Sequence, residues 1–462
     1  MSRPPLVRYA GLGGSVLLAV AAWSSGARSP WRPTMTPRTV LSGAEGLLAP
    51  SAWVLGTVLL IGAWWAGRNA VPSVRWAYVT AGLWALPLLP VLPLASYDVY
   101  SYACQGHVLA AGQDPYSAGV AALGCPWLEA VSPTWRDAPA PYGPVFLLLA
   151  AAAARLGGTL AGTVAALRVI AVLGVLLIAV CLPVLARRRG VPVERAVWLV
   201  LACPLIPIHL ISGAHNDAVM VGLLLAALAV ATRPPATVTL LAAGVLIGLA
   251  TGVKVTAVVV LPFLVLMAAP ARAPIRVLLR PAALILGAAA AALVAVSAAT
   301  GLGFGWLANL SDSGVSVQWT SPPTAVGLTA ELAGRIFGAQ WTVVPAARIL
   351  GLVVLAVVLV VLWWRARDGD PLLYAGLALT ATVVLAPVFH PWYAIWPQAV
   401  LAATVRRETR WLVVPAAVAA VLCLPDGYNL ALATRAQGAV GMTLLIALLA
   451  ARRWRAARAV PA

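Results

Sequence analysis

The sequence predicts an all-α, polytopic membrane protein. Of its 462 residues, 62% are hydrophobic and only 10% are charged, and the mean hydropathy is +0.95. Apolar runs of about 20 residues, the length a helix needs to cross a bilayer, recur along the chain. Runs such as Leu350–Trp364 do not alternate between apolar and polar residues, so they predict helices rather than barrel strands. We therefore expect residues 1–462 to form a single transmembrane domain of about 12–14 helices embedded in a lipid bilayer.

The distribution of arginine indicates which loops face the cytoplasm. The net charge is +18, and most arginines lie in short loops beside apolar runs, as the positive-inside rule requires. This pattern argues against a nucleic-acid partner, and the sequence has neither a GxxxxGK[ST] loop nor a GxGxxG motif after a strand. Met1–Ser25 is interpreted as an uncleaved first span. Lys254 is the only lysine in the chain.

With these markers, the amino-terminal spans place one long loop outside. Crossings are predicted at Val7–Ser24, Val54–Gly67 and Trp76–Ala95, although Arg28, Arg32 and Arg38 then fall outside. Residues 96–144 form the first external loop, in which we expect short surface helices. The chain must next reach the cytoplasmic marker Arg187–Arg189, so Ala161–Ala186 is predicted to span and Gly143–Arg155 to be a re-entrant or surface helix.

The later spans bring further polar residues to the same side. Residues 300–342 form a second external loop, with an interfacial helix after Pro323. Further crossings are predicted at Val197–Ser212, Val219–Thr232, Val238–Thr251, Val255–Ala269, Leu284–Ala299, Val343–Trp364, Leu372–Val388, Leu412–Leu424 and Val440–Ala450. The polar residues that fall outside were not used to set the topology. They are Asp98, His215–Asp217, Lys254, the Trp306–Trp319 loop, His390 and Asp426. Their convergence predicts one external site at the membrane surface.

Several motifs resemble one known family. SYDVYSYACQGHVLAAGQDPY (96–116), WRDAPAPYGP (135–144), GAHNDAVMVGLLLA (213–226), GVKVTAVVVLPF (252–263) and FHPWYAIWP (389–397) resemble the polyprenol-phosphomannose-dependent α-1,6-mannosyltransferases. These are GT-C glycosyltransferases of cell envelopes. The resemblance implies a GT-C helical bundle in the plasma membrane, whose first external loop carries an acidic catalytic residue, here Asp98. It also implies a polyprenyl-phosphate-mannose donor, a lipid-linked mannan acceptor in α-1,6 linkage, inversion at the anomeric carbon, and no metal or cofactor.

The chemistry of such a transfer suggests roles for further residues. One carboxylate must take the proton of the attacking hydroxyl, and fixed cations and hydrogen-bond donors should face the departing phosphate. The donor-binding candidates are Lys254, His390, His215 and Arg136. The acceptor- or sugar-binding candidates are Asp217, Asp137, Tyr142, Tyr97, Trp392 and Tyr393.

Each candidate also has a structural alternative. Asp98 could cap a helix beginning near Val99, and His215–Asp217 could cap the helix that follows. Arg136 and Asp137 could form a local ion pair, and Lys254 could extend to the membrane interface. His390, Trp392 and Tyr393 could belong to an aromatic belt.

Cysteine usage and function class leave further alternatives open. Cys104 and Cys125 share the external loop, where a disulfide is chemically allowed, whereas Cys181, Cys203 and Cys423 lie in apolar runs and are expected to pack. The cysteines and histidines show no zinc-type spacing. The alternative functions are transfer of another sugar from a polyprenyl-phosphate donor, a transporter or lipid flippase, and a membrane scaffold. A transporter would normally carry ionisable groups deep within its spans. Here the acidic residues cluster at external helix ends instead, and Arg168, within a predicted span, is an exception to this pattern.

Overall fold

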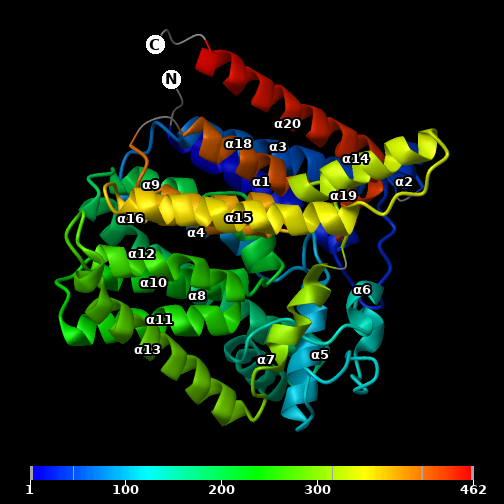
Figure 1. Ribbon diagram of the computed structural model, residues 1–462. Coiled ribbons are helices and arrows are strands. Elements are labelled where there is room, and N and C mark those ends of the chain that lie inside the picture. The colour runs from blue at the N-terminus through cyan, green and yellow to red at the C-terminus, as the bar shows by residue number, and fades with distance from the viewer. Residues whose placement is uncertain (1–3, 45, 315, 407–408, 459–462) are drawn as a thin grey trace.

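The computed structural model describes residues 4–44, 46–314, 316–406 and 409–458, and over these residues the protein is a bundle of helices (Figure 1). No strand occurs in the described part of the chain, where only an isolated bridge pairs Cys423 with Asn429. The all-α prediction is therefore confirmed. Residue 315, in the predicted second loop, lies outside the described residues.

Among the described residues, five helices are long and apolar enough to cross a membrane, or six if a bent pair near residue 204 counts as one span. The five are α1 (Pro4–Ser25), α3 (Leu48–Gly67), α8 (Leu160–Arg188), α13 (Ile275–Thr300) and α15 (Val344–Ala366). Together with the shorter apolar helices, they make this a multi-pass membrane protein. The total number of crossings remains a prediction.

The shorter apolar segments complete the bundle. They are α7 (Pro144–Gly157), α10 (Asp217–Ala231), α11 (Thr237–Val253), η4 (Val255–Val260) with α12 (Leu261–Met267), α16 (Pro371–Leu385) and α18 (Arg410–Ala420). The remaining helices are α2 (Pro37–Ser42), α4 (Val74–Ala85), η1 (Leu86–Leu88), α5 (Asp98–Ala110), η2 (Leu128–Ala130), α6 (Pro133–Arg136), α9 (Val193–Leu201), η3 (Ile206–Ser212), η5 (Gly305–Gly314), α14 (Pro322–Ile336), η6 (Pro391–Ala394), α17 (Ile395–Leu401), α19 (Leu430–Ala433) and α20 (Arg435–Arg458).

The segment between the first loop and the arginine triplet folds as two helices. The span expected at Ala161–Ala186 is α8, and the segment expected to be re-entrant or superficial is α7. Helix α7 packs against α5 and α8, with Phe146 and Leu147 almost completely buried. The first loop carries α5 and α6, which lie together at the right of the bundle in Figure 1.

One predicted span is broken. Val197–Ser212 was expected to be continuous, but α9 and η3 meet at an angle of 61°. Pro204 lies in the break and Pro207 in the first turn of η3, and proline cannot donate the backbone hydrogen bond that a straight helix needs. Arg168 of α8 supports this irregular backbone, since its guanidinium donates to the carbonyl of Leu89 at 2.5 Å and to that of Ser212 at 2.9 Å. A buried arginine is thereby explained without a transport role.

Two other predicted spans are shorter than expected. Helix α4 ends at Ala85, and the chain continues through η1 and a proline-rich stretch to Ser96 instead of remaining helical to Ala95. The segment from Val255 begins as the tight helix η4 and becomes α-helical only at Leu261. Both irregular segments border the candidate site, and they allow side chains at the helix ends to face it.

Candidate active site

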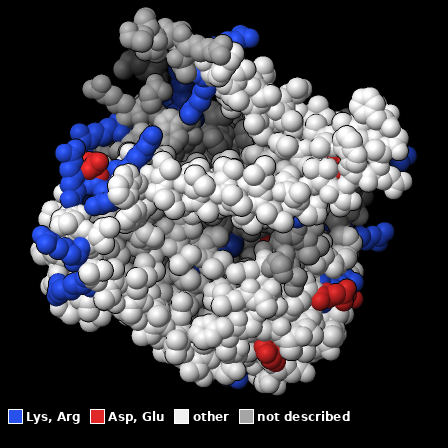
Figure 2. Space-filling model, in the orientation of Figure 1, with Lys and Arg blue, Asp and Glu red and all other residues white. Residues whose placement is uncertain are grey.

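Two cavities meet at the carboxylate of Asp98. The first has a volume of about 630 Å³ and the second about 550 Å³. Asp98, Trp135, His390 and Trp392 line both. Figure 2 shows that the surface is hollowed below the band formed by α15, which supplies part of the first cavity's wall. The two cavities therefore border each other at Asp98.

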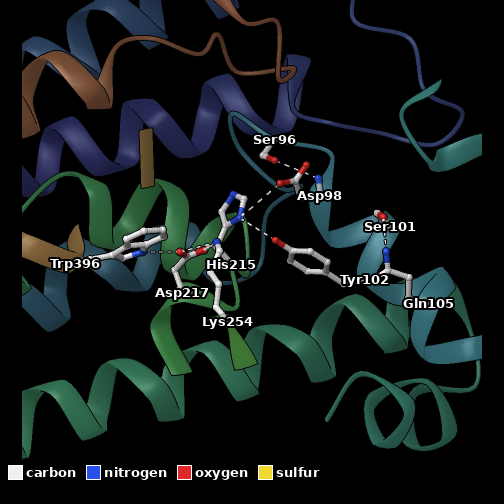
Figure 3. A network of polar contacts seen from close by, with 9 residues as sticks. All are labelled: Ser96, Asp98, Ser101, Tyr102, Gln105, His215, Asp217, Lys254 and Trp396. Carbon is white, nitrogen blue, oxygen red and sulfur yellow. Dashed lines mark hydrogen bonds and ion pairs between the residues drawn. The ribbon is translucent and has the colours of Figure 1, made fainter. Parts of the chain in front are cut away.

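The Asp98 side chain does not cap the helix that begins at this residue. Helix α5 begins at Asp98 with Tyr97 as its N-cap residue, and no side chain caps it. The Asp98 amide donates to the hydroxyl of Ser96 at 3.1 Å, while the carboxylate points toward His215 (Figure 3). Asp98 Oδ2 lies 4.0 Å from His215 Nδ1. The structure therefore does not show the helix-capping alternative for Asp98.

The surroundings of Asp98 shift its acidity toward neutrality. Its side chain is only 16% exposed, and burial raises its pKa from 3.8 to about 6. The charge of Lys254 and a hydrogen bond from Trp135 oppose this rise, and the charge of Asp217 adds to it. A carboxylate with a pKa near 6 is still ionised at neutral pH but holds a proton better than an exposed aspartate.

Lys254 is fixed where α11 ends. Its backbone is extended, so the side chain leaves the helix and reaches the first cavity. Lys254 Nζ donates to both carboxylate oxygens of Asp217, at 2.9 and 3.1 Å, and lies 4.3 Å from the ring centre of Tyr393. Asp217 is completely buried and also accepts a 2.6 Å hydrogen bond from the indole of Trp396 (Figure 3). These contacts hold the Lys254 side chain in one position, so it does not extend to the membrane interface.

Three of the four histidines gather around one tryptophan. The ring centre of Trp392 lies 3.7 Å from that of His215, 4.8 Å from that of His390 and 5.6 Å from that of His209. Burial and the charge of Lys254 lower the pKa of His390 to about 3. Burial also lowers the pKa of His215, which lies in the loop before α10. Both rings are therefore neutral at pH 7, so they are expected to contact a ligand through hydrogen bonds rather than through charge.

The two cavities differ in chemistry. The first combines Lys254 and Arg348 with apolar walls from α15 and α16, including Leu352, Leu355 and Val383. The second is lined by hydroxyl, amide and aromatic side chains. They include Trp31, Tyr97, Ser132, Thr134, Gln318, Tyr428 and Asn429. The first cavity is thus suited to an anionic group attached to an apolar chain, and the second to a hydroxyl-rich ligand.

The predicted residues do not all reach these cavities. Asp98, Lys254, His390, Trp392, Tyr142 and Tyr393 line the first, and Tyr97 lines the second. His215 and Asp217 lie behind the cavity walls, in contact with Asp98 and Lys254 respectively.

Arg136 and Asp137 lie apart from the site, and we withdraw the ligand contacts expected of them. The Arg136 guanidinium donates to the carbonyls of Val131 and Glu129, so it stabilises its own loop. Asp137 is exposed and, within the described structure, does not line either cavity.

Sequence reasoning missed Trp135 and Arg348. Trp135 hydrogen-bonds Asp98 and lines both cavities, but it stands within a loop whose fold has no periodic signal. Arg348 lies in the first turns of α15, at the end predicted to face outward. An arginine on that side runs against the positive-inside pattern, and this exception could have identified it.

A disulfide fixes the helix that carries Asp98. Cys104 of α5 is bonded to Cys125, with the two Cα atoms 5.5 Å apart. The alternative left open by the sequence is thus decided in favour of a bond. Cys181, Cys203 and Cys423 are free and buried, as expected of packing residues.

The fold defines a polytopic, all-α membrane protein in which two cavities share the side chain of Asp98. The chain belongs to the alpha-(1→6)-mannopyranosyltransferase family: the N-terminal domain of that family matches residues 8–270, and the family domain described as the MptB C-terminal domain matches residues 323–454.

Curated relatives support this membership. The chain is 32% identical over 434 residues to alpha-(1→6)-mannopyranosyltransferase A of Mycobacterium tuberculosis, covering 90% of this chain and 84% of the relative. It is 29% identical over 441 residues to alpha-(1→6)-mannopyranosyltransferase B of Corynebacterium glutamicum, covering 87% and 73%. No solved structure matches the chain.

Proposed function

We propose that this protein is an inverting mannosyltransferase. It transfers mannose from polyprenyl-phosphate-mannose to a lipid-anchored mannan, forming an α-1,6 linkage at the external face of the plasma membrane. The observation that carries the proposal is the position of Asp98, which is shared by a cationic, apolar-walled cavity and a polar one. The names of the relatives support the sugar and the linkage.

The first cavity is the proposed donor site. Lys254 and Arg348 supply positive charge for the phosphate, and the walls formed by α15 and α16 accommodate the first isoprene units. Arg348 is itself held by the hydroxyl of Thr324 and the carbonyl of Ser316. Fixed cations facing the departing phosphate stabilise the charge that develops there in the transition state.

The second cavity is the proposed acceptor site. Its hydroxyl and amide groups can bind sugar hydroxyls, and Tyr97, Trp31 and Trp392 provide aromatic surfaces. The acceptor's 6-hydroxyl gives its proton to Asp98 as its oxygen attacks the anomeric carbon. The bond to phosphate breaks on the opposite side of that carbon, so the configuration inverts. The phosphate leaves toward Lys254 and Arg348.

Two residues act through others in this proposal. Asp217 was expected to bind sugar, but its contacts with Lys254 and Trp396 make it the residue that positions the lysine. His215 packs beside Asp98 on the side away from the cavities. Its Nδ1 is hydrogen-bonded to the hydroxyl of Tyr102, 3.3 Å away. Its stacking on Trp392 connects it to the wall common to both cavities.

Two observations support the external location. The Cys104–Cys125 disulfide joins segments of the loop that lines the site, and disulfides persist in oxidising compartments. Arginines gather at the other end of the bundle, at the left of Figure 2, as expected for a cytoplasmic side.

The test compares donors with purified protein in detergent. Polyprenyl-phosphate-mannose, polyprenyl-phosphate-glucose and GDP-mannose are each supplied with a short α-1,6-mannoside, with and without EDTA. We expect transfer from the first donor alone, unaffected by EDTA, and an α-linked product by NMR from a β-linked donor. Transfer from GDP-mannose, or a β-linked product, would overturn the donor or the inverting mechanism respectively. Preference for the glucosyl donor would overturn the sugar.

A further inference from the structure

A third cavity, far from Asp98, lies at the opposite end of the bundle. It has a volume of about 260 Å³ and forms where four segments converge. These are the ends of α8 and α10, the loop between α12 and α13, and the turn between α15 and α16. Helix α15 connects this cavity to the active site, since Arg348 lines the first cavity and Arg367 lines the third. At 1.5 Å per residue these positions are about 28 Å apart, close to the hydrocarbon thickness of a bilayer.

This cavity is strongly basic. Its lining includes five arginines and a single acidic residue. They are Arg188, Arg189, Arg233, Arg272 and Arg367, with Asp370. Figure 2 shows arginine side chains gathered at this end of the molecule, with acidic atoms among them. A positive-inside bias explains arginines in these loops, but it does not require four separate segments to place them around one hollow.

Some of these arginines already have partners. Arg189 pairs with Asp370 at 2.6 Å, and Arg272 pairs with Asp368 at 3.0 Å. Arg367 donates to the carbonyl of Ala273 and lies over the ring of Trp364. Within the described part of the chain, Arg188 and Arg233 make no ion pair and no side-chain hydrogen bond, so the cavity retains positive charge without a protein partner.

We propose that this cavity binds the phosphodiester headgroup of an anionic phospholipid in the leaflet opposite the active site. Planar guanidinium groups bind phosphate oxygens in pairs, and basic pockets between membrane helices are suited to anionic headgroups. The hollow can hold a headgroup but not acyl chains. Leu266, Leu278 and Leu372, which are buried, contribute the apolar part of its lining. The inference does not depend on the proposed sugar transfer.

Binding is measured by native mass spectrometry on the full-length, delipidated protein in detergent. The probes are phosphatidylglycerol, phosphatidylcholine and inorganic phosphate. The test variant is Arg188→Gln with Arg233→Gln. The control, Arg187→Gln with Arg276→Gln, removes the same charge from exposed positions outside the cavity lining. Each arginine near a lipid phosphate contributes about 1 kcal/mol, so we expect the test variant to bind phosphatidylglycerol about 30-fold more weakly.

The controls separate a specific site from diffuse charge. Wild type and the control variant should bind one phosphatidylglycerol with similar affinity and prefer it to phosphatidylcholine. Equal weakening in the control variant, or unchanged binding in the test variant, would overturn the site. Saturation by inorganic phosphate at the same concentration would show a free-phosphate site and overturn the lipid. If the double variant does not fold, Arg233→Gln alone is measured, with about fivefold weakening expected.

Discussion

Replacing Asp98 with asparagine should remove activity yet increase stability at neutral pH. The folded protein raises the pKa of Asp98 from 3.8 to about 6, so the ionised carboxylate is held at a cost. Each unit of pKa difference corresponds to about 1.4 kcal/mol, so the full difference is about 3 kcal/mol at most. Asparagine has nearly the same shape and no charge, and it removes this cost.

The sign of the pH dependence follows from proton binding. Between pH 3.8 and about 6 the folded state binds more protons at Asp98 than the unfolded state, so its stability decreases as pH rises through that window. Asp98→Asn should therefore unfold at a higher temperature than wild type at pH 7.5. The difference should shrink as the pH approaches 4.

The assay is thermal unfolding in detergent at matched scan rates, followed by tryptophan fluorescence. Asp137→Asn is the matched control because Asp137 is an exposed carboxylate of the same loop. It should leave the midpoint unchanged. A lower midpoint for Asp98→Asn at pH 7.5, or a gain that persists unchanged at pH 4, would refute this reasoning.

Three further outcomes are expected. Because the proposed base is ionised Asp98, kcat/KM should fall about tenfold per unit below pH 6, and a flat profile down to pH 5 would contradict this. Asp217→Asn should lower stability by about 3–5 kcal/mol and raise the donor KM, because it leaves Lys254 without its buried partner; unchanged unfolding and KM would contradict a positioning role. Cys104→Ser should lower stability by about 3 kcal/mol, and a reductant should bring wild type to the same midpoint; a reductant without effect on unfolding would show that the bond contributes little.

The residues whose location sequence analysis anticipated are those that lie at helix ends. Asp98 and Lys254 each lie at the end of an apolar run, so hydropathy and charge placed them on one side. The prediction of α8 succeeded for the same reason, since Arg187–Arg189 fixed its end. Hydropathy reports only whether a segment can be buried in lipid, and this information is sufficient to locate residues at the ends of such segments.

The errors arise at positions where tertiary contacts determine the backbone conformation or the direction of the side chain. The break between α9 and η3 depends on prolines within a uniformly apolar run, so hydropathy did not detect it. Arg136 belongs to the right loop, but the fold of that loop directs its side chain toward the carbonyl of Val131. Trp135, its neighbour, reaches Asp98 instead. The backbone geometry of the loop thus directs Trp135 to the site and Arg136 away from it, and no local sequence pattern encodes that geometry.

The measurement that tests the central claim most directly is single-turnover mannose transfer by wild type, Asp98→Asn and Asp137→Asn at saturating donor and acceptor. Removal of the base should reduce the rate of Asp98→Asn by about 10²–10⁴, while donor binding remains and Asp137→Asn retains the wild-type rate. If Asp98→Asn transferred mannose at the wild-type rate, Asp98 would not be the base and the proposed meeting of donor and acceptor at this carboxylate would be wrong.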